Sequence, residues 1–145
     1  MKKQEYLDLR KRHQQELEEF PIAYAFNEKQ LEEALIKLNT TKEEVVTVFG
    51  HGDIVKRENA KPFIKMLEDQ QEELLQRIRD DEEFAEAAFA YEMDNHEYAI
   101  NWSGDDDVLD CFGLSFEKIN KWGLHRAWKR AVAQHMENAR KWEMI

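Results

Sequence analysis

The amino-acid sequence predicts an α+β domain that is predominantly α-helical, with five to six helices and one small two-stranded hairpin. Apolar residues recur every three or four positions along most of the chain, which is typical of amphipathic helices. Only the stretch from Val45 to Lys56 combines β-branched residues with turn-forming glycines. The chain has 145 residues, no internal repeat and only two prolines, so we expect a single domain over 1–145.

The first two helices are predicted from apolar stripes and from residues typical of helix ends. Pro21 ends the first helix, and Asn27 with Gln30 forms a capping box that starts the second. The first stripe consists of Tyr6, Leu9, His13, Leu17 and Phe20, and the second of Leu31, Ala34, Leu35 and Leu38. The hairpin follows, with strands at Val45–Phe49 and Ile54–Val55 joined by a turn at Gly50–Asp53.

The second half of the chain is expected to be helical apart from one polar loop. A long helix begins near Asn59, and a second begins at Asp80 or Asp81 and runs to Tyr98. The loop covers 101–107, and Ser115 caps a short helix that precedes a final one. The expected core positions are Phe26, Leu35, Leu67, Leu74, Phe84, Tyr91, Leu109 and Trp128.

The charge of the chain disfavours direct binding of nucleic acid. It carries 31 acidic and 21 basic residues, a net charge of -10, and acids dominate from Glu68 to Asp110. Such a field repels polyanions and attracts basic partners, although a solvated acidic face that aids solubility is the simpler interpretation. The sequence has one cysteine, no signal peptide and no apolar run long enough for a membrane helix. We therefore expect a cytoplasmic location.

Glu92 and His96 are the most informative pair for chemistry. Four residues apart on a helix, they lie one turn above each other beside apolar positions. A carboxylate and an imidazole at the edge of a core either pair with each other or bind a divalent metal such as zinc or manganese. Further metal ligands are expected from His51 and Asp53 in the hairpin turn, or from Asp105 and Asp107 in the later loop.

Other residues that resemble catalytic or binding motifs have simpler explanations. Asp105–Asp107 lacks the spacing of a calcium loop, and Gly50–Gly52 is too short to bind phosphate. We expect Cys111 to be a small core residue, because a Cys–His nucleophile requires a histidine folded against it. The tryptophans among the basic residues of the last helices are expected in the core.

Three segments resemble a known sequence pattern: the run from Ala88 to Tyr98, which ends in Asn95-His96-Glu97-Tyr98, and the segments Gly104–Leu114 and Phe20–Gln30. Through these segments the chain resembles an uncharacterised family of small acidic proteins from phages and mobile genetic elements. The resemblance covers roughly residues 20 to 119. It implies a protein encoded by a mobile element and acting in the host cell, where proteins of this type often block defence nucleases such as Cas9.

Three functions from different classes follow from these observations. The first is a non-enzymatic, acidic binding protein that inhibits a basic host nuclease of the Cas9 type, as an anti-CRISPR protein does. The second is a metal-dependent hydrolase or nuclease centred on Glu92 and His96, which the acidic charge disfavours for nucleic-acid substrates. The third is a structural or self-associating domain without activity. No catalytic residue is assigned.

Overall fold

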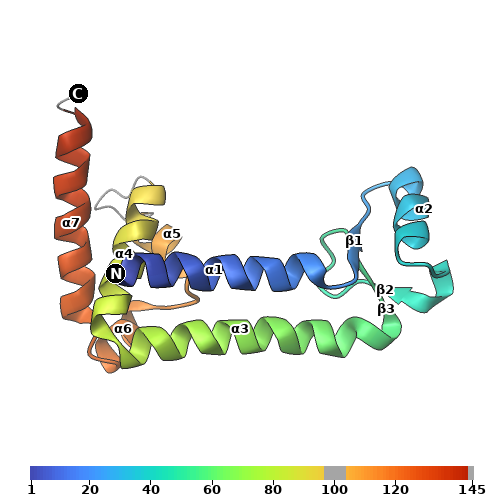
Figure 1. Ribbon diagram of the computed structural model, residues 1–145, viewed down its shortest axis with the longest axis horizontal. Helices are drawn as coiled ribbons and strands as arrows, with labels where there is room; N and C mark the ends of the chain where they lie inside the picture. The colour runs from blue at the N-terminus through green and yellow to red at the C-terminus, as the bar shows by residue number, and fades with distance from the viewer. Residues whose placement is uncertain (97–103, 144–145) are drawn as a thin grey trace. The chain divides into compact units, whose positions relative to one another are not determined.

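The computed structural model describes residues 1–96 and 104–143, which fall into two compact units. Unit 1 comprises Met1–Arg10 and Gln71–Ile145, and unit 2 comprises Lys11–Gln70. The division falls within the two long helices α1 (Lys2–Glu19) and α3 (Ala60–Asp80), both seen in Figure 1. That one folding domain spans residues 1–145 stays a prediction.

Unit 1 is helical throughout its described part and contains the larger core. Its complete helices are α4 (Glu82–Asn95), α5 (Gly104–Asp110), α6 (Phe116–Lys121) and α7 (His125–Glu143). The main packing is between α4 and α7, and Phe89 of α4 meets Trp128 of α7 edge-on. The predicted core positions Phe84, Leu109 and Trp128 are all buried, as expected.

The ends of these helices follow the sequence signals. The side chain of Asp81 accepts a hydrogen bond from the backbone N–H of Phe84 and begins α4, as predicted. Ser115 does the same for Lys118 at the start of α6. A partly buried polar contact joins α4 to α7, where His135 Nδ1 lies 2.6 Å from Oδ1 of Asp94. Its donor and acceptor depend on the tautomer of the imidazole.

Unit 2 contains the only sheet in the described part of the chain. Its strands β1 (Ile22–Tyr24), β2 (Val45–Val46) and β3 (Asp53–Lys56) form an antiparallel sheet in the order β1-β3-β2. The predicted hairpin corresponds to β2 and β3, but the two-stranded sheet is wrong because β1 pairs with the other side of β3. Three residues directly after a proline are too few for an alternating pattern to be recognised.

The turn of the hairpin is organised by one buried carboxylate. Asp53 is 3% exposed, and its side chain accepts hydrogen bonds from the backbone N–H groups of Val48, Phe49 and His51. Burial alone would raise the pKa of this carboxyl, but the three N–H donors together lower it. These bonds bend the chain after Val46, so the strand predicted to reach Phe49 ends three residues early.

The helix count and one core assignment also differ from the expectation. The described residues form seven α-helices rather than five or six, because α5 (Gly104–Asp110) begins where a polar loop was expected. Three aspartates occupy its first turn, where negative charge is favourable. Phe26 is 74% exposed and does not belong to the core. The remaining predicted core residues are half-buried: Leu35, Leu67, Leu74 and Tyr91.

Two further predictions concern residues outside the described ranges. Helix α4 ends at Asn95 with His96 as its C-cap, so it stops before the predicted end at Tyr98; positions 97 and 98 and the loop residues 101–103 lie outside the described ranges. Among the described helices, none has an apolar stretch that would cross a membrane.

Candidate functional sites

Glu92 is the buried acid of unit 1. It lies on the last turns of α4, is 1% exposed, and has apolar neighbours that include Phe89 and Met93. Its atom Oε2 accepts hydrogen bonds from the Tyr6 hydroxyl and from the Arg10 guanidinium, the latter at 2.8 Å. Both donors come from α1, one turn apart. An ionised carboxylate at a buried position requires such partners, because unpaired burial is costly.

The other oxygen of Glu92 lies close to His96 and Cys111. The distance from Oε1 to His96 Nε2 is 3.8 Å, and Nε2 is 3.1 Å from Cys111 Sγ. Glu92 and His96 are neighbours because they are four residues apart at the end of α4. Cys111 directly follows α5, and its sulfur also lies 3.4 Å from the main-chain oxygen of Asp107. The three potential ligand atoms all lie within 4.8 Å of one another.

Without a bound metal ion, burial and the charge of Glu92 keep the Tyr6 hydroxyl and the Cys111 thiol protonated. Burial raises the pKa of Tyr6, and the hydrogen bond to Glu92 raises it further, so the phenol stays a neutral donor. Burial also raises the pKa of the Cys111 thiol, and the negative charge of Glu92 adds to the effect. The thiol is therefore a poor nucleophile as it stands.

The structure brings together only part of the predicted set of metal ligands. Glu92 and His96 are adjacent, as predicted. His51 and Asp53 belong to unit 2, where the Asp53 carboxylate already binds three backbone N–H groups. Asp105 and Asp107 lie in the first turn of α5, and neither contributes a carboxylate to the one three-residue group found in the described part of the chain.

Sequence reasoning missed three residues of the cluster. Cys111 was expected in the core, but it is only partly buried and a histidine does fold against it. Tyr6 was expected only as part of the apolar face of the first helix, and Arg10 was given no role. Their contacts with Glu92 join positions 86 and 82 residues apart, which no local spacing predicts.

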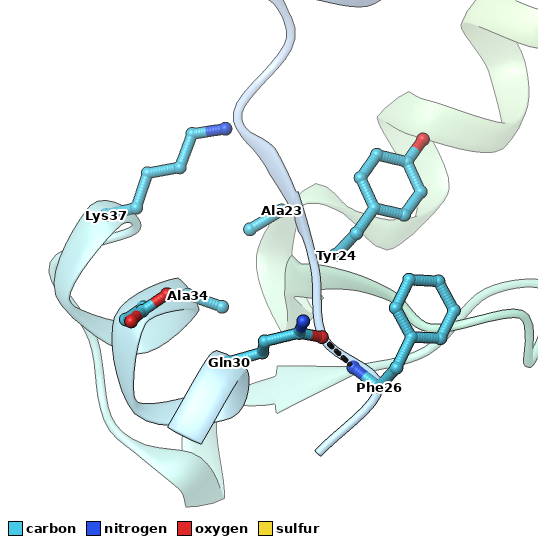
Figure 2. A pocket seen from close by; sticks show the side chains of 7 residues that line it. Ala23, Tyr24, Phe26, Gln30, Ala34 and Lys37 are labelled. Atoms are coloured by element: carbon cyan, nitrogen blue, oxygen red, sulfur yellow. Dashed lines mark hydrogen bonds between the residues drawn. The ribbon is translucent and has the colours of Figure 1, made fainter. Parts of the chain in front are cut away.

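Unit 2 carries a second candidate site, a shallow pocket of about 370 Å³ beside β1. Figure 2 shows Ala34, Gln30 and Lys37 of α2 (Glu28–Lys37) on one side of this strand, with Ala23 pointing toward them. The rings of Tyr24 and Phe26 lie on the other side. The residues that line the pocket are Ala23, Tyr24, Phe26, Gln30, Glu33, Ala34 and Lys37.

The pocket follows the outer edge of the sheet, where one backbone group of β1 and one just after it are already hydrogen-bonded. Lys37 donates to the carbonyl oxygen of Ile22 at 3.1 Å, and the Gln30 side chain accepts from the N–H of Phe26 at 2.8 Å. The backbone N–H of Ala25 donates to the carbonyl oxygen of Gly52, on the side of β1 that faces β3. Because alternate residues of a strand direct their backbone groups to opposite sides, the N–H and C=O of Tyr24 point away from β3. This short edge can therefore accept a partner's backbone at one residue.

The two rings beside this edge are exposed to solvent. Tyr24 is 54% exposed and Phe26 is 74% exposed. The Phe26 ring lies over Gly52, where a Cβ atom would come within 2.5 Å of it, and Gly52 has a φ of +83°. The positive φ therefore favours glycine at position 52, and a larger residue there would also displace the exposed Phe26 ring.

A family model described as a family of unknown function (DUF7659) matches residues 5–134. The chain belongs to this family. No curated protein and no solved structure matches it. The matched region includes both candidate sites, from Tyr6 to Cys111, and the family's description assigns no activity to either.

Proposed function

We propose that this protein is a non-enzymatic binding protein that uses the edge of β1 as its docking site for a basic segment of another protein. The observation that carries the proposal is the exposed pair Tyr24 and Phe26 beside a pocket with a free acid at its rim. Exposed aromatic side chains next to a polar rim are typical of protein–protein contact sites.

The acidic net charge of the whole chain favours a basic partner, while α2 itself carries Lys29 and Lys37 beside its three glutamates. Glu33 lines the pocket, is exposed, and makes no ion pair within the described residues. Glu28 and Glu32 are exposed on the same helix, and the chain as a whole has a net charge of -10. A lysine or arginine of the partner next to an apolar residue would fit Glu33 and the two rings.

The finer proposal names the partner as a basic, nucleic-acid-handling host protein, specifically a defence nuclease of the Cas9 type. Its support is the acidic charge together with the resemblance to small acidic proteins of phages. On this proposal the protein inhibits the nuclease by occupying a surface that would otherwise contact nucleic acid, and it binds no nucleic acid itself.

The test is a cleavage assay with a purified Cas9-type nuclease and increasing amounts of this protein. We expect a complex on size-exclusion chromatography and loss of cleavage at molar excess. Glu33→Lys should weaken the complex at least tenfold, because it puts a like charge opposite the basic partner. Glu32→Lys makes the same charge change on the same helix outside the pocket lining, so its effect should be small.

Two results would contradict the proposal. Full cleavage at molar excess without any complex would remove the nuclease as the partner. A complex weakened equally by Glu33→Lys and Glu32→Lys would mean that net charge, and not the β1 edge, determines binding.

A further inference from the structure

Three ligand-type atoms in unit 1 converge on one point. Glu92, His96 and Cys111 each offer one ligand atom, and these three atoms all lie within 4.8 Å of one another. They come from the end of α4 and from the residue that follows α5. This cluster lies in a different unit from the β1 edge, so an inference from it is independent of the proposed function.

Which imidazole nitrogen faces the thiol and the carboxylate distinguishes a metal site from a catalytic triad. In a Cys–His–acid triad, the thiol and the carboxylate bind opposite nitrogens of the imidazole, so that the ring relays a proton. Here Sγ and Oε1 both lie nearest the same nitrogen, Nε2, at 3.1 and 3.8 Å. Such an arrangement surrounds a common centre and does not form a relay.

The separations fit a first-row transition metal. Zinc binds sulfur, nitrogen and oxygen at about 2.0–2.3 Å, and tetrahedral angles then separate these ligand atoms by about 3.3–3.6 Å. The sulfur–nitrogen distance of 3.1 Å is a little shorter than this range, and the nitrogen–oxygen distance of 3.8 Å is a little longer. The third separation, from the Glu92 carboxylate to the Cys111 sulfur, is at most 4.8 Å, so one ion could draw the three ligand atoms together.

The neighbours of Glu92 orient it as a ligand. Tyr6 and Arg10 both bind Oε2, which leaves Oε1 for the shared centre. Oε1 also accepts a long hydrogen bond from the Asn95 amide, at 3.4 Å. Outer partners that hold one carboxylate oxygen and leave the other for the ion are typical of metal centres.

The donor set also indicates which ion would bind. A thiolate and an imidazole favour Zn²⁺ and related thiophilic ions, while Mg²⁺, Ca²⁺ and Mn²⁺ prefer oxygen ligands. The cysteine therefore narrows the pair of ions expected from the sequence, zinc or manganese, to zinc. Exposed acids on α5, Asp106, Asp107 and Asp110, add negative charge to the helix that precedes Cys111.

We propose that Glu92, His96 and Cys111 together bind one divalent transition-metal ion of the Zn²⁺ type. Binding forms a metal–sulfur bond, and the thiol proton of Cys111 passes to solvent. Three protein ligands leave one coordination position for water or for a further ligand.

The test is a titration of untagged, chelator-treated protein with Co²⁺ as a spectroscopic substitute for Zn²⁺. We expect one equivalent to bind per chain, with a thiolate-to-cobalt charge-transfer band that excess Zn²⁺ removes. Cys111→Ser and His96→Ala should abolish the band and weaken Zn²⁺ binding at least a hundredfold. His51→Ala, which removes an exposed histidine of unit 2, is the matched control and should leave both unchanged.

Both test positions are partly or largely exposed, and circular dichroism of the metal-free variants establishes that each is folded. The absence of a charge-transfer band in the wild-type protein would overturn the proposal. A band that survives His96→Ala, or one that His51→Ala removes, would overturn it equally, because the ligands would then be others.

Discussion

Tyr6 donates its hydroxyl hydrogen to Oε2 of Glu92, although the two residues are 86 positions apart in the sequence. This bond joins the start of α1 to the end of α4 inside the core of unit 1. Because Arg10 binds the same oxygen, a carboxylate that is 1% exposed has two donors and stays compatible with burial.

Tyr6→Phe should destabilise the protein by about 1–3 kcal/mol, because Glu92 loses one donor while remaining buried. The measurement is urea denaturation at neutral pH. Tyr91→Phe is the control, since Tyr91 is half-buried and its hydroxyl has no described partner. Equal effects of the two changes would show that the Tyr6–Glu92 bond contributes nothing specific.

The same variant should also affect the metal. If Tyr6 orients Glu92 as a ligand, Tyr6→Phe should lower Zn²⁺ affinity by about 10–100-fold while the three ligands remain. Competition with a zinc-sensitive dye measures this affinity. An unchanged affinity would mean that Tyr6 has only a structural role.

Phe84→Ala should cost about 3–5 kcal/mol, because its ring is fully buried between Tyr6 and the other side chains of the unit 1 core. Phe26→Ala should change stability by less than about 0.5 kcal/mol, since Phe26 is 74% exposed. Chemical denaturation of both variants measures these two stability changes. A midpoint that does not move for Phe84→Ala would contradict its placement.

Asp53→Asn should destabilise unit 2 by about 1–3 kcal/mol at neutral pH, because a neutral amide replaces a carboxylate bound to three N–H donors. The folded-state pKa of Asp53 is lowered, so its contribution is complete above the unfolded value of about 3.9. This stabilising contribution is lost as the pH falls from the unfolded-state pKa through the lower folded-state pKa.

The difference in unfolding free energy between wild type and Asp53→Asn should therefore be constant from pH 7 to 5 and shrink below about pH 4. Denaturation curves across this range measure it. Asp69→Asn, at an exposed ion pair with Lys65, is the control and should have little effect. A difference that grows as the pH falls would contradict the role of Asp53.

Local sequence signals predicted much of this fold. Apolar spacing and capping residues placed α1, α2, α4 and α6, because these signals act within one helical turn. The spacing of four also predicted that Glu92 and His96 are neighbours. Strand β1 was missed because its three residues become a strand only by pairing with β3.

The rest of the candidate metal site could not be predicted, because its contacts are long-range. Cys111 meets His96 only once α5 packs against α4, and nothing in the sequence near Cys111 indicates this approach. Arg10 is a charged residue on a helix that the sequence predicts simply as amphipathic. Asp53 was proposed as a metal ligand, but its carboxylate binds backbone N–H groups of the hairpin turn, such as that of Val48. Nothing in the local sequence indicates that the turn folds over this side chain.

The most direct test of the metal site is anomalous diffraction at the zinc absorption edge from crystals of the untagged protein grown with one equivalent of Zn²⁺. We expect one strong peak about 2.0–2.3 Å from Oε1 of Glu92, Nε2 of His96 and Sγ of Cys111. No peak at this position, with the Cys111 sulfur still in direct contact with His96, would contradict the account.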